Sequence, residues 1–257
     1  MLENQPSQTL AKGLTILEAF STNRQHWGIR ELARELDLSP ATVTRLVTTL
    51  ANNGYLEQDP NTQRYSLGPM VMKLGNLYAF HNPLSMMARK IFEKYAGIFE
   101  YNFYLGKLSR FQVIYLAALD GRGRIKVVVE QGGTTGLHST ALGKVLLAFH
   151  DDDFVNQFMA SDHFVQYTAN SITDPNKLWE QIRKIRTTGI AVNEGEHFDD
   201  VSAVGAPIYN QTGEVVAGIS LAYPRLLVEN GYMDPESLVP LIKRIAAEIS
   251  DLYSENS

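Results

Sequence analysis

The feature that most constrains the fold of this chain is a short amphipathic segment that spans residues 39–54. Its apolar residues recur at the spacing that lines up one stripe of an α-helix, and they are Val43, Leu46, Val47 and Leu50. Ser39 is a preferred N-cap residue, Pro40 suits the first helical position, and Gly54 suits the left-handed exit from a helix. The segment is therefore predicted to be a helix with one buried face.

Segments on both sides of this helix complete the pattern of a winged helix-turn-helix. A second short apolar stripe over residues 29–36 and a turn at 37–39 precede it. Two β-like runs, 55–59 and 63–68, follow it and flank a turn at 60–62. The alternative is a small helical core with a decorative hairpin, because apolar stripes occur in every globular helix.

The outer face of the predicted helix carries hydrogen-bonding side chains, one positive charge and no acid. Side chains of this kind can read the edges of base pairs in the major groove of DNA. The residues that we expect to reach bases are Thr42, Thr44, Arg45 and Thr48. The residues that we expect to contact phosphates are Ser39 and, in the wing, Gln63 and Arg64.

The composition excludes several classes of protein. The 257-residue chain contains no cysteine, so a disulfide framework, a thiolate metal site and a cysteine nucleophile are impossible. Its N-terminal residues are polar and lack the pattern of a signal peptide, and no apolar run approaches the roughly 20 residues that span a bilayer. We therefore expect a soluble cytoplasmic protein with no membrane partner.

The charge distribution limits how the chain can bind DNA. The net charge is −5, but residues 1–80 contain seven basic and seven acidic side chains, so residues 81–257 carry the whole excess. A neutral DNA-binding part cannot rely on counterion release by a broad basic surface. Affinity would have to come from placed phosphate contacts and from joining several copies of the chain.

The remaining segments predict an α+β fold with two domains. Helical spacing of apolar residues extends over 8–20, 69–81, 84–95, 141–149, 151–160, 175–188 and 235–252. β-like runs extend over 103–105, 112–117, 125–130, 190–192, 202–204, 207–209 and 214–222, with turns at 106–107 and 120–124. This order favours a largely antiparallel sheet. We expect a winged helix-turn-helix domain at 1–68, a linker helix at 69–83 and a second domain at 84–257.

A candidate ligand site lies at the start of the predicted helix 141–149. Ser139 and Thr140 stand where an N-cap belongs. A helix N-terminus presents free backbone N–H groups and favours an anion, so a carboxylate ligand would fit there. The alternative is that one hydroxyl only caps the helix and the pocket lies elsewhere. An apolar wall, or ordinary core, could be formed by Tyr104, Tyr115 and Val128.

Other chemistries are less well supported by the pattern. Gly143-Lys144 invites comparison with a phosphate-binding loop, but that motif needs glycine and a hydroxyl residue where this chain has His138 and Val145. The acidic loop 194–200 with its histidine could hold a metal, although a solvated loop is the simpler interpretation. No spacing indicates a catalytic triad. We expect no cofactor, no metal and no enzymatic activity; an enzyme, or a sensor that acts through protein partners, is the alternative.

With these segments in order, the chain resembles the IclR family of bacterial transcription regulators over nearly its whole length. The similar stretches of the N-terminal part are residues 10–17, 29–33, 39–46 and 54–56. Those of the C-terminal part are residues 137–148, 189–193, 206–208 and 213–217. The resemblance implies a winged helix-turn-helix, a GAF-like domain that binds a small organic or aromatic acid, and homodimers that commonly pair into tetramers.

The resemblance also implies the positions of an effector pocket. The matching residues are Ser139, Thr140, Ala141, Asn193, Ala203 and Ser220. Asn193 stands where the family frequently has an acidic residue, and Ala203 stands where it frequently has cysteine. The second departure leaves the pocket roomier or more apolar, which argues against a tiny, highly polar keto acid. The implied function is a repressor of a catabolic operon that places one helix 39–53 in each half-site of a double-stranded operator.

Overall fold

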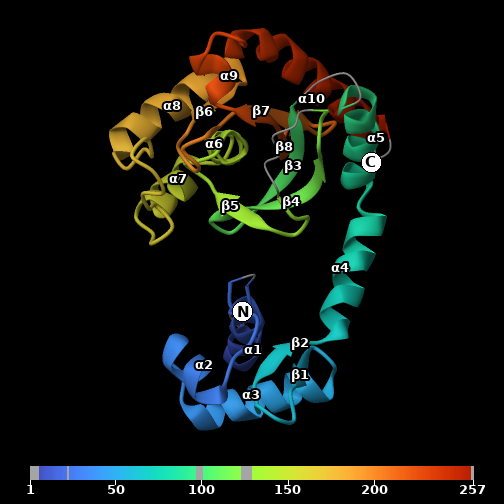
Figure 1. Cartoon of the computed structure of the whole chain (residues 1–257), viewed down its shortest axis with the longest axis vertical. Coiled ribbons are helices and arrows are strands. Elements are labelled where there is room, and N and C mark those ends of the chain that lie inside the picture. The colour runs from blue at the N-terminus through green and yellow to red at the C-terminus, as the bar shows by residue number, and fades with distance from the viewer. Residues whose placement is uncertain (1–5, 22, 97–100, 123–128, 256–257) are drawn as a thin grey trace, which may run out of the picture. The chain divides into compact units, whose positions relative to one another are not determined.

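The structure is a computed structural model that describes residues 6–21, 23–96, 101–122 and 129–255. The chain divides into two compact units, Met1–Phe80 and His81–Ser257, and each is described here by itself (Figure 1). None of the described helices is long and apolar enough to cross a membrane.

The first unit is a small helical fold with a two-stranded hairpin. Its elements are α1 (Gln8–Glu18), α2 (Ile29–Glu35), α3 (Pro40–Asn52), β1 (Leu56–Gln58), β2 (Tyr65–Leu67) and α4 (Pro69–His81), whose last residue belongs to the second unit. The hairpin is antiparallel, with Leu56 opposite Leu67. The fully buried core residues include Ile16, Leu32, Val43 and Val47 of three helices and Leu56 of β1. Burying such a side chain contributes roughly 1.5–3 kcal/mol.

The ends of α3 form as the sequence predicts. Ser39 Oγ accepts a hydrogen bond from the N–H of Thr42 at 3.2 Å, and Pro40 occupies the first turn. Gly54 follows the helix with a φ of 74°, a conformation that glycine adopts without strain. The helix is therefore delimited by local chemistry at both ends, and its apolar stripe determines which face is buried.

The second unit is an α+β fold around one six-stranded sheet. Its helices are α5 (Pro83–Ala96), α6 (Ala141–Ala148), α7 (Asp152–Met159), α8 (Pro175–Thr188), α9 (Leu226–Glu229) and α10 (Leu238–Glu255), with the 3-10 turn η1 (Pro235–Ser237) before α10. Its strands are β3 (Asn102–Ser109), β4 (Gln112–Leu119), β5 (Thr134–Gly136), β6 (Ala191–Glu194), β7 (Val201–Tyr209) and β8 (Val215–Pro224). The described strands pair antiparallel in the order β5-β4-β3-β8-β7-β6.

The sheet separates two hydrophobic cores. Phe103 and Leu105 of β3 join the core that α5 and α10 cover, whereas Tyr104 joins the core formed with α6, α7 and α8. Neighbouring residues join different cores because successive side chains of a strand point to opposite faces. The sheet curls around α6, and all eight residues of that helix are buried (Figure 1). The fold class expected from the sequence is confirmed.

The turn expected at residues 106–107 is wrong. β3 continues through it, with a bulge between Leu105 and Gly106, and pairs with β4 as far as Ser109. A Cβ on Gly106 would lie 2.6 Å from Val113 Cγ1 and 2.8 Å from Leu142 Cδ2. The glycine is therefore explained by close packing of the strand against its neighbours, and not by a turn.

Two other strand predictions differ from the structure. The runs 202–204 and 207–209 form the single strand β7, which tolerates Pro207 because the edge strand β6 pairs with it only as far as Gly205. In the run 125–130, residues 125–128 lie outside the described residues, and Val129 and Glu130 are not in a strand. The strand that pairs with β4 at this edge is β5, which begins at Thr134. The short helix α9 was not expected.

Candidate functional site

α3 presents the polar face that the sequence predicts. The exposed side chains of this face include Thr44, Arg45 and Thr48. Thr42 is half-buried, because its Oγ1 lies 2.9 Å from Ser39 Oγ at the N-cap. No ion pair in the described part of the chain involves Arg45. The helix therefore offers one guanidinium and several hydroxyl groups to a partner.

The wing holds its arginine in an ion pair. Arg64 Nη2 lies 2.6 Å from Glu31 Oε2 of α2 and donates a hydrogen bond to the carbonyl of His26 at 3.1 Å. The hydrogen bond from the Gly28 N–H and then the contact with Arg64 lower the pKa of Glu31. Gln63 adopts a φ of 58° at the end of the turn. Sequence reasoning did not anticipate that Arg64 ties the wing to α2.

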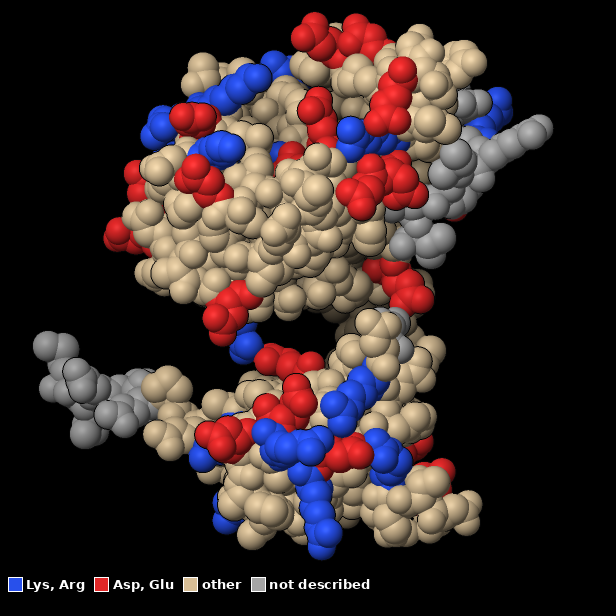
Figure 2. Space-filling model, turned by 60° about the vertical axis from the view of Figure 1, so that its left-hand side comes forward, with Lys and Arg blue, Asp and Glu red and all other residues tan. Residues whose placement is uncertain are grey.

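The surface of the first unit is electrostatically mixed. Figure 2 shows acidic and basic side chains intermingled on the visible face of this unit. Arg24 adds to the pairing, because its Nη2 lies 3.4 Å from Glu31 Oε2 and its guanidinium stacks 3.3 Å from the centre of the Trp27 ring. The neutral charge balance of residues 1–80 is thus accompanied by ion pairs among Arg24, Arg64 and Glu31.

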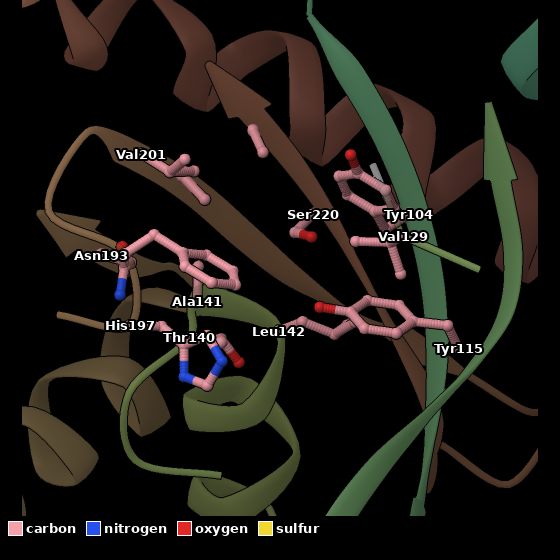
Figure 3. A pocket seen from close by; sticks show the side chains of 13 residues that line it. Tyr104, Tyr115, Val129, Thr140, Ala141, Leu142, Asn193, His197, Val201 and Ser220 are labelled. Carbon is pink, nitrogen blue, oxygen red and sulfur yellow. The ribbon is translucent and has the colours of Figure 1, made fainter. Parts of the chain in front are cut away.

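A cavity in the second unit lies at the N-terminus of α6. The cap of this helix is Thr140, whose Oγ1 accepts a hydrogen bond from the N–H of Gly143 at 3.0 Å and donates one to the carbonyl of Gly136 at 3.0 Å. The N–H groups of Ala141 and Leu142 make no hydrogen bond within the described residues, and both residues line the cavity. The start of α6, with these two free donors, therefore lies beside the cavity (Figure 3).

Most of the predicted effector positions meet in this cavity. The predicted residues that line it are Thr140, Ala141, Asn193, Ala203 and Ser220. Strand pairing brings them together, because Asn193 lies opposite Ala203 and Ala203 lies opposite Ala222, two residues beyond Ser220. Ser139 is fully buried and does not line the cavity; its carbonyl accepts a hydrogen bond from Asn193 Nδ2. Ser139 thus holds the rim of the site.

Sequence reasoning missed His197 as part of this cavity. The sequence pattern indicates His197 only as part of the acidic loop 194–200. In the structure His197 Nδ1 lies 2.9 Å from Ser139 Oγ, and its Nε2 lies 3.4 Å from Thr135 Oγ1. Burial, and then the nearby His138, lower the pKa of His197 to about 4. The imidazole is therefore neutral near pH 7. Its position after β6, facing the hydroxyl at 139, could not be read from spacing.

An aromatic wall closes the other side of the cavity. Tyr104 and Tyr115 point into it with their ring centres 5.6 Å apart (Figure 3). Burial raises the pKa of Tyr104 and raises the pKa of Tyr115 to about 12, so both phenols stay neutral hydrogen-bonding groups. The expected wall residue Val128 lies outside the described residues, and Val129 lines the cavity. The cavity is small, with a volume of about 50 Å³.

No lysine or arginine lines the described part of this cavity. The nearest cation on the same helix, Lys144, is fully buried, with its Nζ 2.6 Å from Glu196 Oε1 and 2.8 Å from Gln181 Oε1. An anion in the cavity would therefore depend on the α6 N-terminus. No group of three or more potential metal ligands occurs among the residues that the structure describes.

Comparison with known proteins places both parts of the chain in one family. The model described as the IclR helix-turn-helix domain matches residues 9–60, and the model described as the bacterial transcriptional regulator IclR C-terminal matches residues 78–251. The transcriptional regulator KdgR of Dickeya chrysanthemi is 26% identical over 252 residues, which cover 97% of this chain and 82% of KdgR. KdgR of Escherichia coli is 27% identical over 227 residues, or 88% of this chain and 86% of that protein.

Solved structures show the same fold. A putative IclR transcriptional regulator from Silicibacter sp. TM1040 matches with a TM-score of 0.85 and 26% identity, covering 96% of each chain. An IclR homologue from Microbacterium hydrocarbonoxydans, solved in complex with 4-hydroxybenzoate, matches with a TM-score of 0.73 and 19% identity, covering 97% of this chain and 100% of that one. Because the family models match most of the chain and the named curated relatives are DNA-binding regulators and not enzymes, the chain belongs to the IclR family of bacterial transcriptional regulators.

Proposed function

We propose that this regulator is a repressor of a catabolic operon and that a small aromatic or organic carboxylate controls it. The observation that carries the proposal is the pair of unused N–H groups at the start of α6, whose residues line a cavity with an aromatic wall. The 4-hydroxybenzoate complex of the Microbacterium homologue supports a ligand of this class.

The proposed effector carboxylate accepts hydrogen bonds from the N–H groups of Ala141 and Leu142, where the helix dipole also favours negative charge. Its ring lies against Tyr104 and Tyr115. The neutral His197 and the polar side chains of Thr140, Asn193 and Ser220 are available to the ring substituents. Phe198 also lines the small cavity and is about half exposed, so its outward rotation can make room for a ring. Ala203 lines the site, and Ser139 supports it through the hydrogen bond that its carbonyl accepts from Asn193 Nδ2.

In the proposed DNA complex, α3 of each copy lies in the major groove of an operator half-site. Thr42, Thr44, Arg45 and Thr48 reach base edges. The residues that contact phosphates are Ser39, Gln63 and Arg64. Arg64 can contact a phosphate while it stays ion-paired with Glu31, because a guanidinium has five N–H donors.

We infer that the operator is bound by a homodimer or a dimer of dimers. α4 has no buried residue within the chain, although it carries several large exposed apolar side chains, namely Met72, Leu74, Leu77, Tyr78 and Phe80. Leu10 and Leu14 of α1 are also exposed. An apolar surface of this kind favours a second copy of the chain. The proposed domains are a DNA-binding domain at 1–68, a linker at 69–83 and an effector domain at 84–257. The linker transmits binding of the effector as a shift in population between two arrangements of the paired DNA-binding domains.

Calorimetry with the full chain tests the effector site. We expect 4-hydroxybenzoate to bind at least about tenfold more tightly than 4-hydroxybenzyl alcohol, which has the same ring and no carboxylate. Ala141→Pro should remove most of this preference, because proline is tolerated at the first helical position but lacks the N–H. Gln8→Pro, the same change at the first position of α1, is the matched control and should leave binding unchanged. Equal binding of acid and alcohol would overturn the assignment of the site.

Footprinting on the chain's own upstream DNA tests the control of transcription. We expect a footprint on paired half-sites that 4-hydroxybenzoate, or another carboxylate found to bind, weakens. Protection that strengthens with the ligand would contradict repression, and protection that does not respond to a bound carboxylate would contradict the effector role.

A further inference from the structure

A second cavity of the C-terminal unit adjoins the effector pocket and has a volume of about 220 Å³. β5 lines it with Thr134, Thr135 and Gly136, and the segment between α7 and α8 lines it with His163 and Tyr167. His197 lines both cavities and is the one residue that the described parts of their linings share (Figure 3). The effector pocket and the second cavity therefore meet at the side chain of His197.

The aromatic neighbours of the His197 ring belong to different cavities. The ring of Tyr167, whose centre lies 4.3 Å from that of the imidazole, lines the second cavity. The ring of Phe198, whose centre lies 4.7 Å from that of the imidazole, lines the effector pocket. The imidazole thus stands between one aromatic ring of each cavity and separates the two spaces.

Two hydroxyl groups hold the His197 ring at this boundary. The ring nitrogens Nδ1 and Nε2 lie 2.9 Å from Ser139 Oγ and 3.4 Å from Thr135 Oγ1. A neutral imidazole has one donor and one acceptor, so it can use both contacts. Ser139 is fully buried and Thr135 is 8% exposed, so both hydroxyl groups belong to enclosed residues. The ring is therefore fixed across the boundary and does not hang freely into either cavity.

The lining of the second cavity suits an uncharged part of a ligand. No aspartate, glutamate, lysine or arginine is among its described lining residues. The amide of Gln112 and the hydroxyl groups of β5 supply hydrogen bonds, whereas Phe111 and Tyr167 supply aromatic rings. Aromatic rings pack well against each other in offset or edge-to-face arrangements. A ligand that extended past His197 would therefore place a neutral, aromatic part in this cavity.

We propose that His197 is a specificity-determining residue that limits the size of the effector. Its side chain keeps the effector pocket apart from the second cavity, and so favours acids with one aromatic ring over acids with two fused rings. Phe198 has a different role, because it is 52% exposed and its removal would open the pocket to solvent. The inference rests on the proposed carboxylate effector for the class of ligand.

Calorimetry with the full chain at pH 7 tests the size limit. The probes are 4-hydroxybenzoate and 6-hydroxy-2-naphthoate, which carries the same polar groups on two fused rings. We expect the parent protein to bind the one-ring acid at least about tenfold more tightly, because the imidazole excludes the second ring. His197→Ala should lower this ratio of affinities at least about tenfold, because the second ring then enters the second cavity.

Three further variants locate the effect. His197→Gln keeps a side chain of similar length with hydrogen-bonding groups and should keep the ratio of the parent protein. Thr134→Trp, added to His197→Ala, fills the second cavity from its exposed strand position and should restore the ratio. His163→Ala removes an exposed histidine that lines the second cavity away from the boundary, and should leave the ratio unchanged. If His197→Ala loses its thermal transition, His197→Ser makes the same test.

The proposal is overturned if the parent protein binds the two acids equally well, or if the folded His197 variant keeps the ratio of the parent. The corresponding alcohols, 4-hydroxybenzyl alcohol and 6-hydroxy-2-naphthalenemethanol, distinguish this outcome from failure of the proposed function. Alcohols that bind as tightly as the acids would refute the carboxylate effector, whereas a ratio between them that responds to His197 would still support the size limit. Absence of binding by all four compounds would overturn both.

Discussion

α3 and α6 begin alike and lie in different surroundings. Each has a hydroxyl N-cap that accepts a hydrogen bond from the third residue of the helix, at 3.2 Å for Ser39 and 3.0 Å for Thr140. α3 buries three of its 13 residues, whereas α6 buries all eight. The difference teaches that two helices with the same kind of cap can differ in surroundings: α3 keeps an exposed side-chain face, whereas α6 has no exposed side chain and only its N-terminal residues line a cavity.

The largest contrast is expected between the cations of these two helices. Lys144→Met leaves the buried carboxylate of Glu196 without its partner, so we expect the free energy of unfolding to fall by about 3–5 kcal/mol. Arg45→Met removes an exposed charge and should change it by at most about 0.5 kcal/mol. Urea denaturation measures both. The double variant Lys144→Met with Glu196→Gln should recover part of the loss, and a stable single Lys144 variant would contradict the reasoning.

The next contrast concerns glycines within helices. A Cβ on Gly143 of α6 would lie 2.3 Å from the carbonyl oxygen of Gly136, so Gly143→Ala should destabilise the protein by about 3 kcal/mol and weaken binding of the effector. In α4 a Cβ on Gly75 would meet nothing within 4 Å, so Gly75→Ala should stabilise by about 0.5–1 kcal/mol. Thermal unfolding of both variants distinguishes them. Similar changes in the unfolding temperature of the two variants would show that α6 is packed less tightly than its contacts indicate.

A smaller effect is expected for DNA recognition by α3. Arg45→Ala should weaken binding to the specific operator by about 1–3 kcal/mol if the guanidinium contacts guanine, and should leave non-specific binding nearly unchanged. Lys73→Ala, which removes a charge from α4, is the control and should not alter the footprint. Fluorescence anisotropy with operator and scrambled duplexes measures the specific and the non-specific affinity separately. If Arg45→Ala binds the operator with unaltered affinity, Arg45 does not contact the bases.

The last contrast is a pH dependence of stability that the enclosed site contributes through His197. The pKa of His197 lies at about 4 in the folded protein and near 6.5 when the residue is exposed. The unfolded chain therefore binds more protons between these values, and the stability that the neutral ring contributes is complete above pH 6.5 and falls as the pH falls toward 4. Between pH 7 and pH 5 the parent protein should lose more stability than His197→Gln. Urea denaturation of both proteins at pH 7 and at pH 5 measures the loss of unfolding free energy. Equal losses in the parent protein and in His197→Gln would refute the prediction.

Local patterns in the sequence were sufficient for α3, because cap, proline, apolar stripe and terminal glycine all act within a few residues. They narrowed the cap of α6 to Ser139 or Thr140, and the structure shows that Thr140 is the cap. They failed at Gly106, where the glycine is required by packing against Val113, and they did not indicate the ion pair of Arg64 with Glu31, which is 33 residues away. In both cases the cause is a contact between distant segments, which no local pattern encodes.

The sequence by itself determined the two-part organisation, the α+β class of the second part, the polar face of α3 and five of the residues that line the pocket. Only the tertiary structure decided that His197 lines the pocket, that Ser139 supports it, and that Glu194 and Tyr223 line a different cavity on the opposite side of the same strands. The physical reason is strand register. Pairing of β6, β7 and β8 brings together residues that are up to about 30 positions apart, and the alternation of side chains then assigns neighbouring rungs to different cavities.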